Sequence, residues 1–519
     1  MKNRIKLGLF MGAVLFATSC SLDQDPISDF SEITVGGKDT TDTSVKFKTK
    51  EEMKTQYDGI YKAIQNAQEA WYADMLVLNE THSDNAYCGS SGAELTSLEQ
   101  QTQDGTNKNI ERDWNAFLGY INTANRVINN VDLVPDQSLT QAERKQWKAE
   151  AKIWRAWILF DMVRLWGDVP VVTEEAPDIT AENVEEVYPL LYPSRKPVAE
   201  VYAQIISDLN AALEPGGAPA VNAGNKFLLT KSVANALLAR VYAEKPVRDY
   251  AKVIQYAEAV QNDGFKLVPD FSDLFSVNDA KTDVNFRNTS ESIFEVTYPV
   301  GSGNWVTWMF GIDHVDPNST YNWAKWITPS RDLIQAYENE GDNVRMNQAI
   351  VWGQPSWSNH YPSDHYPFMY KTRSKYNSII KIRLADILLL KAEAYVETGN
   401  LQAAAALVNT VRNRAKLADL PATTVSSKEK MADAVLNERR LELAYEGQRW
   451  FDLQRWGGSV MATELKAYVD FEKQYIPKFA AASYLQAART MFPVPDGQIQ
   501  TMGNDESGKP YLVQPEPWK

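Results

Sequence analysis

Cysteine and histidine are scarce in this sequence. The 519-residue chain contains two cysteines, Cys20 and Cys88, and four histidines. No Cys-x-x-Cys motif is present, and no group of histidines surrounds Cys88 in the sequence. His360 and His365 lie five residues apart, but no third ligand is evident. We therefore predict no cofactor and no metal site, leaving open only a structural cation, because zinc and redox centres need clustered ligands.

An excess of positive charge is also missing. The chain has 53 Lys and Arg against 67 Asp and Glu, a formal net charge of −14. Nucleic acids and anionic lipid headgroups are bound by Lys and Arg, so this balance argues against nucleic acid or anionic lipid headgroups as the partner. The hydrophobic content of 44% and the charged content of 23% are those of a globular protein that buries a large core.

Long hydrophobic runs are absent except near the N-terminus. The basic residues of this region are Lys2, Arg4 and Lys6. They precede an apolar run, Leu7–Ala17, that is too short to span a bilayer as a helix. The run ends at Ser19-Cys20, which is similar to the cleavage site of bacterial lipoproteins, where the cysteine is acylated. We predict a signal peptide at residues 1–19, lipidation of Cys20 and a flexible tether over residues 20–50.

One departure from that pattern leaves an alternative open. Lipoprotein signals prefer Leu three residues before the cysteine, and this chain has Ala17 there. A plain secretory signal with an incidental Cys20 is the alternative. The acidic residues soon after Cys20 resemble the surface-export signal of some bacterial lipoproteins. If Cys20 is lipidated, no second cysteine remains for a disulfide with Cys88.

Apolar residues recur at helical spacing over most of the chain, which predicts a mostly α-helical fold. The ranges expected to be helical are 51–68, 111–131, 140–166, 198–213, 230–244, 248–262, 381–397, 401–416 and about 460–485. The run Ile293–Tyr298 alternates and is the best candidate strand. Residues 71–110 are expected to form a polar loop, with His82 at the surface.

Two pairs of expected helices echo each other. Residues 239–242 and 392–395 have similar sequences, and each stands near the end of an apolar helix that a turn joins to an alanine-rich helix. Such units resemble tetratricopeptide repeats, with generic α-hairpins as the alternative. We expect a helical-repeat scaffold packed against an irregular, loop-rich half with a few short strands.

The region around residues 266–380 has weaker periodicity and many aromatic residues. The six in one short segment are Trp305, Trp308, Phe310, Tyr321, Trp323 and Trp326. Flat aromatic faces stack on the C–H faces of sugar rings, while nearby polar side chains bind the hydroxyls. We expect a ligand-binding insertion here, with about half of its aromatic residues serving a small satellite core instead. 

Residues 436–457 have apolar residues seven positions apart, which predicts one helix. Ser426 and Glu429 fit a capping box just upstream, and Gly457-Gly458 fits the end. Arg440 falls between the apolar positions and must find a polar partner, because an unpaired buried charge is costly. Gly447 in mid-helix would permit a close helix crossing.

This stretch resembles the C-terminal signature of the SusD/RagB family of outer-membrane nutrient-binding lipoproteins. The blocks that carry the resemblance are Ile382–Tyr395, Val408–Ala415 and Asn437–Trp450, in that order, with Arg155–Pro170 as an earlier landmark. The resemblance implies one SusD-like domain over residues 51–519, anchored by lipid to the outer face of the outer membrane. The protein would capture an oligosaccharide and deliver it to a SusC-like TonB-dependent transporter.

The residues that contact the ligand vary within this family. The resemblance therefore indicates only the regions of this sequence in which such residues are expected. In the 71–110 loop the candidates are Trp71, Asp84 and Tyr87, and in the aromatic segment they are Trp305, Trp308, Tyr321, Trp323 and Trp326. Arg373, beside two tyrosines, is a further candidate. A glycoside hydrolase would need a defined carboxylate pair, which no motif singles out, so we predict that the protein is not an enzyme. A binder of peptide or of another nutrient is the remaining alternative.

Overall fold

Four long helices form the N-terminal part of the fold. The computed structural model describes residues 45–89, 92–175, 193–321, 326–480 and 490–504, with residues 180, 183, 187, 508, 510, 512–516 and 518. The long helices are α2 (Lys50–Asn66), α5 (Lys108–Asn130), α6 (Gln141–Trp166) and α8 (Val198–Leu213). Each agrees with a predicted helix within a few residues. Capping boxes begin α2 at Thr49 and α6 at Thr140, satisfying backbone N–H groups of the first turn.

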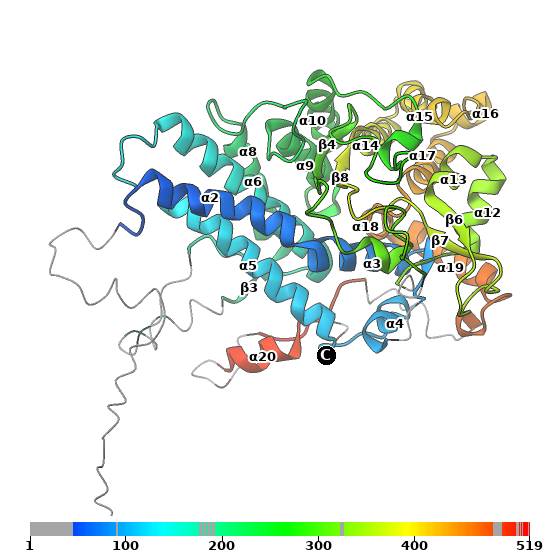
Figure 1. Ribbon diagram of the computed structural model, residues 1–519, viewed down its shortest axis with the longest axis horizontal. Helices are drawn as coiled ribbons and strands as arrows, with labels where there is room; N and C mark the ends of the chain where they lie inside the picture. Colours follow the sequence, from blue (N-terminus) through cyan, green and yellow to red (C-terminus); the bar gives the residue numbers. More distant parts are fainter. Residues whose placement is uncertain are drawn as a thin grey trace, which may run out of the picture. The chain divides into compact units, whose positions relative to one another are not determined.

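The two predicted helix pairs are present. They are α9 (Lys231–Ala243) with α10 (Tyr250–Asn262), and α14 (Leu384–Glu397) with α15 (Leu401–Arg414). A short 3₁₀ turn, η2 (Lys245–Val247), joins the first pair. The members of each pair pack together, and α10 also packs against α14, so the pairs stack in sequence (Figure 1). The prediction of a mostly α-helical fold is confirmed.

The predicted helix at 436–457 is wrong in one respect, because it is two helices. They are α17 (Lys428–Leu443) and α18 (Arg449–Trp456). Between them Tyr445 and Gly447 have positive φ values of 63° and 69°, a region that favours glycine. Gly447 therefore serves a turn and not a helix crossing. The cap also differs by one residue, since the Ser427 side chain accepts the Lys430 N–H.

The predicted polar loop at 71–110 is also wrong, because much of it is helical and buried. It contains the π-helix η1 (Gln68–Ala73), α3 (Asp74–Thr81) and α4 (Ala93–Glu99). All residues of α3 are buried. The turn after α17 explains part of this arrangement, since the Gly447 N–H donates to Glu80 Oε1 at 2.9 Å. The buried Glu80 carboxylate of α3 thus has a hydrogen-bond partner inside the protein.

The strands of the described residues are short and form four antiparallel pairs. They are β1 (Ala86–Tyr87) with β5 (Thr328–Pro329), β2 (Val169–Pro170) with β3 (Arg195–Lys196), β4 (Ser292–Val296) with β8 (Ile379–Arg383), and β6 (Ile350–Gly353) with β7 (Tyr366–Met369). The strand predicted at 293–298 corresponds to β4. Its partner β8 occupies the first residues of the helix predicted at 381–397, so α14 starts later than expected.

The remaining helices lie in the loop-rich part and at the C-terminal end. They are η3 (Phe271–Leu274), α11 (Thr307–Phe310), α12 (Arg331–Glu340), α13 (Asn343–Ala349), α16 (Ala422–Val425), α19 (Gly458–Glu472), η4 (Pro477–Ala480) and α20 (Asp496–Met502). The 460–485 prediction agrees with α19 as far as Glu472 and with η4, while residues 481–485 lie outside the described residues. Figure 1 shows α12, α13, β6 and β7 on the side away from α2 and α5.

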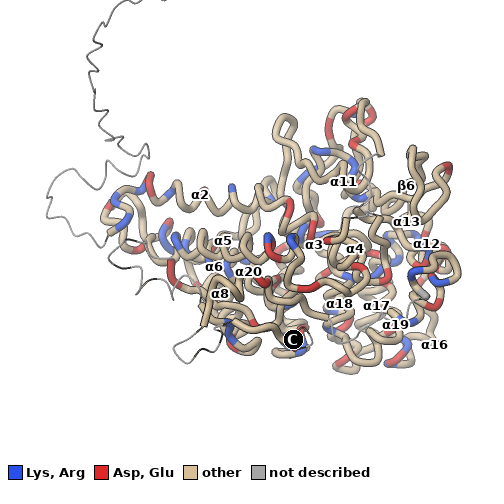
Figure 2. Tube along the Cα trace, turned by 90° about the horizontal axis from the view of Figure 1, so that it is seen from below, with Lys and Arg blue, Asp and Glu red and all other residues tan. Residues whose placement is uncertain are grey.

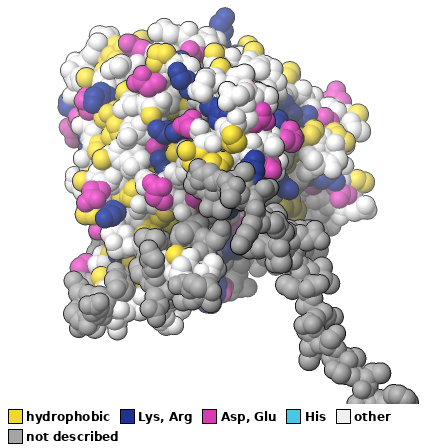
Figure 3. Space-filling model, turned by 90° about the vertical axis from the view of Figure 1, so that its left-hand side faces the viewer, with side chains coloured by type: hydrophobic (Ala, Val, Ile, Leu, Met, Phe, Trp, Pro, Cys, Tyr) yellow, Lys and Arg dark blue, Asp and Glu magenta, His cyan; other side chains and the backbone are white. Residues whose placement is uncertain are grey.

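Residues Phe47–Lys519 make up one compact unit, with a main core that joins α2, α5, α6, α9 and α14. Figure 2 shows Lys and Arg positions interspersed with Asp and Glu positions along it. On the face drawn in Figure 3, hydrophobic side chains lie among charged ones in small groups. Within the described residues, no helix combines the length and the apolar character needed to cross a membrane.

Candidate ligand-binding site

An open cleft of about 840 Å³ lies beside α11. Two indole side chains, Trp305 and Trp308, line it and are 38% and 37% exposed. The other lining residues are Gly301, Ser302, Gly303, Asn304, Thr307, Asp313, Asp316, Asn318, Ser319, Thr320, Lys375 and Tyr376. Large aromatic side chains are normally covered, so two partly exposed tryptophans in one polar cleft are the clearest ligand-binding feature here.

The backbone at the base of the cleft is held by hydrogen bonds to the 374–377 segment. The Asn304 N–H donates to the Lys375 carbonyl at 2.6 Å, and Asn304 Nδ2 donates to the Asn377 carbonyl at 3.0 Å. Thr307 Oγ1 donates to the Ser374 carbonyl at 3.0 Å. These bonds surround the start of α11, so the two tryptophans stand on a fixed segment. Fixed side chains lose little entropy when a ligand binds.

Gly303 lets the two sides of the cleft approach. A Cβ atom at this position would lie 3.1 Å from the Lys375 carbonyl oxygen and from Lys375 Cγ. Any larger residue would therefore push the 374–377 segment away. This close contact favours glycine here, since its φ is not positive.

Polar side chains complete the cleft. Asp313 Oδ1 accepts the Val315 N–H, and Asp316 Oδ1 accepts the Asn318 N–H at 2.9 Å, so both carboxylates order the loop. Lys375 Nζ lies 3.7 Å from Asp313 Oδ2 and its side chain is 40% exposed. The cleft thus offers carboxylate, ammonium and amide groups beside two aromatic faces. Asp313, Asp316, Asn318, Lys375 and Tyr376 were missed by sequence analysis because no periodic or spacing signal connects them.

The other aromatic residues of the predicted segment have different surroundings. Tyr321 stacks on Phe368 of β7 with ring centroids 4.0 Å apart, and burial raises its pKa. Trp326 packs against the main core, and Phe310 is fully buried. Trp323 lies outside the described residues, as does Cys20. Of the predicted aromatic ligands, Trp305 and Trp308 are the two that the cleft brings together.

Trp71 and Asp84 lie in the interior. Trp71 Nε1 donates to Asp161 Oδ2 at 2.8 Å. Asp84 accepts two hydrogen bonds from Arg449 of α18, at 2.8 and 2.6 Å. Burial raises the pKa of Asp84, but Arg440 and Arg449 outweigh this and lower it to about 2. Both side chains therefore stabilise the core and are separate from the cleft.

Tyr87 and Arg373 are likewise committed to internal contacts. The Tyr87 hydroxyl donates to Glu472 Oε2 at 2.6 Å and accepts the Arg331 N–H at 2.8 Å. Arg373 lies over the Tyr370 ring at 3.8 Å and donates to the Tyr370 carbonyl at 2.7 Å. Burial lowers the pKa of Arg373 to about 10. Arg373 supports the cleft only indirectly, since its carbonyl accepts the His314 N–H.

One histidine differs from expectation. His82, expected at the surface, is buried, and its ring lies 4.3 Å from that of Trp450. His360 Nε2 lies 3.0 Å from the Cys88 carbonyl oxygen, and the His365 ring stacks on Trp352 at 3.9 Å. Within the part of the chain that the structure describes, no three His, Cys, Asp or Glu side chains are grouped to hold a metal ion.

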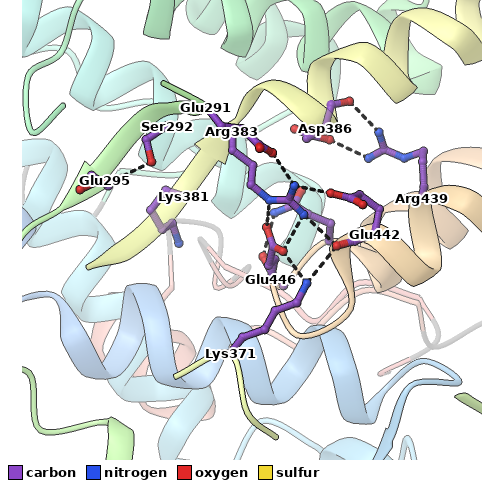
Figure 4. Close-up of polar contacts among 12 residues, drawn as sticks. Glu291, Ser292, Glu295, Lys371, Lys381, Arg383, Asp386, Arg439, Glu442 and Glu446 are labelled. Carbon is purple, nitrogen blue, oxygen red and sulfur yellow. Dashed lines mark hydrogen bonds and ion pairs between the residues drawn. The ribbon is translucent and has the colours of Figure 1, made fainter. Parts of the chain in front are cut away.

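The resemblance-bearing blocks meet in a buried ionic network (Figure 4). Arg383, at the end of β8, donates to Glu291 Oε1 at 2.7 Å and to both carboxylate oxygens of Glu446. Glu442 of α17 pairs with Arg345, Arg383 and Arg414. Burial raises the pKa of Glu442, but these three arginines lower it far more. Removing one partner from such a network is strongly destabilising, so these residues serve the fold.

Arg440 finds the polar partner that its position requires. Its guanidinium donates to Asn85 Oδ1 at 3.0 Å, to the Asp84 carbonyl at 2.8 Å and to Asp332 Oδ2 at 2.6 Å. One acceptor, the Asp332 carboxylate, belongs to α12, and the other two belong to the 84–85 segment after α3. The signature sequence thus describes how α17 and α18 are bonded to the rest of the core.

Two family models match separate parts of the chain. The model described as "SusD family" matches residues 318–514, and the one described as "Starch-binding associating with outer membrane" matches residues 35–243. Together they span most of the sequence, and the first includes the signature blocks of α14, α15 and α17. Over these two stretches the chain is similar to proteins of the SusD/RagB family.

Curated and solved relatives agree. "SusD-like protein P2" of Formosa agariphila is 25% identical over 447 residues, which cover 79% of this chain and 84% of that protein. "Surface glycan-binding protein A" from Bacteroides fluxus superposes with a TM-score of 0.70 at 20% identity, covering 91% of this chain and all of the other. A "laminarin binding SusD-like protein" gives 0.65 at 21% identity, with 91% and 100% coverage. These structural matches establish the fold.

Proposed function

We propose that this protein captures oligosaccharide in the cleft beside α11 without cleaving it. The observation that carries the proposal is the pair of partly exposed tryptophans, Trp305 and Trp308, in a polar cleft of about 840 Å³. That volume lies within the range of about 300–1,000 Å³ typical of small-ligand sites. The binding activities named for two structural neighbours, a glycan in one and laminarin in the other, lend support.

Each part of the cleft has a role in this proposal. The indole faces of Trp305 and Trp308 stack on the apolar faces of sugar rings. Asn318, Asp316 and Lys375 reach hydroxyl groups from the surrounding loops, and charged partners make these hydrogen bonds stronger than neutral ones. Both acidic and basic groups are present, so a neutral glycan fits the cleft better than one carrying many charges of one sign.

The setting that we propose follows from the similarity to SusD-family proteins and from the N-terminal sequence. Residues 1–19 are a signal peptide, Cys20 carries the lipid anchor, residues 20–50 are the tether, and residues 51–519 form the single SusD-like domain. The description of one matching family includes association with the outer membrane. The protein acts on the outer face of that membrane and hands its ligand to a SusC-like TonB-dependent transporter.

Calorimetric titration tests the capture of glycan. The protein lacking its first 20 residues retains the whole compact unit and is titrated with a panel of neutral polysaccharides and their oligosaccharides. Chromatography of the sugars follows on the same samples. Binding of one glycan class with the ligand left intact is the expected result. Cleavage of the ligand would show that the protein is a hydrolase and contradict the proposal. Binding of peptides instead of sugars would show that the ligand is a peptide and not a glycan.

Metabolic labelling with a palmitate analogue tests the anchor. Wild-type protein and the variant Cys88→Ala are expected to incorporate the label and to sediment with outer membranes. Cys20→Ala is expected to lose both properties, since Cys20 is the proposed acylation site. Label retained in Cys20→Ala would contradict the proposal, and the Cys88 variant controls for the loss of a cysteine as such.

A further inference from the structure

A second, much smaller pocket lies away from the cleft, among η1, α3, α6, α9 and the turn between α17 and α18. Its volume is about 40 Å³. A buried water needs roughly 10–15 Å³ on this measure, so the pocket has room for about three water-sized particles. A sugar ring is excluded by size. Any ligand of this pocket is therefore an ion or water.

The charged side chains that line the pocket are mainly cationic. The cations are Arg164, Arg240, Lys371 and Lys381, and the carboxylates are Asp161 and Glu446. Both carboxylates have other commitments. Asp161 accepts from Trp71 Nε1 and pairs with Arg164, while Glu446 is shared by Lys371 and Arg383. The lining thus has more positive charge than its own carboxylates neutralise.

Two of the cations are fixed in place. The Arg164 guanidinium lies between two rings, 3.9 Å from the Phe160 centroid and 3.8 Å from the Phe451 centroid. Arg240 donates to Asp386 Oδ2 at 2.8 Å and to the Lys381 carbonyl at 3.2 Å. In each guanidinium the Nη1 group makes no hydrogen bond to the described residues. These two groups supply donors that remain for a ligand.

Lys381 is the cation without a counter-ion. Its Nζ donates to the Trp71 carbonyl at 2.7 Å and lies 4.1 Å from the centroid of the Trp71 ring. No carboxylate of the described residues lies within ion-pair distance of it, and Figure 4 shows it apart from the joined carboxylates. Burial, with Arg240 and Arg164, lowers the pKa of Lys381 to about 8, while Asp161 opposes that shift. The positive charge of this buried ammonium is therefore not offset by a nearby negative charge, which is energetically costly.

We propose that this pocket binds a small monatomic anion of the size of chloride, held by Lys381 together with Arg164 and Arg240. The anion supplies the charge that the lining lacks, and donors from α6, α9 and β8 converge on it. It acts as a structural ligand at the point where these elements meet the turn after α17. The site is independent of the proposed glycan cleft, because the two pockets share no lining residue.

Bromide substitution tests the proposal directly. Crystals of the protein without its first 20 residues are grown or soaked in sodium bromide, and anomalous scattering locates the halide. A bromide peak within hydrogen-bonding distance of Lys381 Nζ is the expected result. Bromide found only at surface positions, with waters alone in this pocket, would overturn the proposal.

Thermal unfolding provides a second readout in solution. Sodium chloride is compared with sodium gluconate at equal ionic strength, because gluconate is too large for the pocket. Chloride is expected to raise Tm by on the order of 1 °C or more in a saturating manner. The increment should vanish in Lys381→Met and persist in Lys62→Met, which removes an exposed lysine of α2. Equal Tm values in the two salts for wild-type protein would contradict an anion site.

Discussion

Several buried polar side chains in this protein are paired with partners from distant parts of the chain. Asp84 accepts from Arg449, and Tyr87 donates to Glu472, each across more than 350 residues. Such pairs are strong because both groups are removed from water and each satisfies the other. They also explain why polar residues after α3 are compatible with the core.

His82 is an exception among these buried groups. Both of its ring nitrogens are buried without a hydrogen-bond partner in the described residues, and burial lowers its pKa to about 3. In the unfolded chain a histidine takes up a proton near pH 6.5. The unfolded state therefore binds more protons between about pH 6.5 and pH 3, and stability falls as the pH falls through this window.

The variant His82→Leu should remove this dependence. Between pH 7.5 and pH 5, wild-type protein is expected to lose about 2 kcal/mol of unfolding free energy relative to His82→Leu, at about 1.4 kcal/mol per pH unit below 6.5. Urea denaturation at the two pH values measures the difference. His365→Leu, at an exposed position, is the matched control. If the unfolding free energies of wild type and His82→Leu changed with pH in parallel, His82 would have the same pKa in the folded and unfolded states, which would contradict the prediction.

At the scale of elements, α6 organises the N-terminal helices. Arg155 of α6 donates to both carboxylate oxygens of Asp208 in α8, at 2.8 and 2.7 Å, and to Asn125 Oδ1 in α5 at 2.8 Å. All three side chains are buried. One arginine thus connects three helices by directional bonds in addition to apolar packing.

Replacing Arg155 with Ala should lower the unfolding free energy by about 3–5 kcal/mol, because Asp208 would remain buried without a partner. Denaturant titration measures this loss. Lys54→Ala breaks an ion pair with Asp58 on the exposed face of α2 and should cost less than about 1 kcal/mol. The double change Arg155→Met with Asp208→Leu should recover part of the loss. Similar losses for Arg155→Ala and Lys54→Ala would refute the assigned role.

An element can be predicted from the sequence when contacts between residues close in the chain determine it. Contacts between residues far apart in the chain leave no such signal. Helices α2, α5 and α6 follow from apolar spacing and local caps, so their positions were predicted. The break between α17 and α18 was missed, because the apolar spacing continues across it. That turn depends on contacts such as the Gly447 N–H to Glu80, 367 residues away in the chain.

At the scale of the whole molecule, the residues that identify the family and those that line the cleft are different. The signature blocks form the buried network around Arg383 and Glu442, which joins α15, α17 and β8. The cleft is built from loops at 301–320 and 374–377. The fold can therefore be maintained by one set of residues while another set changes with the ligand.

This division also explains how much of the site could be predicted. Exposed aromatic residues in a weakly periodic segment point to Trp305 and Trp308, which meet at the cleft. The same reasoning selects Trp71, Asp84 and Tyr87, whose burial depends on α6, α18 and α19 and is invisible in the local sequence. Lys375 and Tyr376 reach the cleft because the Ser374 and Lys375 carbonyls accept hydrogen bonds from Thr307 and Asn304, which no local pattern encodes.

The most direct measurement of the central claim is calorimetric titration of three tryptophan variants with the oligosaccharide that the wild-type protein binds. Trp305→Ala and Trp308→Ala are expected to weaken binding by about tenfold or more each, roughly 1.4 kcal/mol, since each removes a stacking face. Trp352→Ala should bind as wild type does, because Trp352 is 40% exposed but lies outside the cleft. Unchanged affinity in both cleft variants would contradict the account.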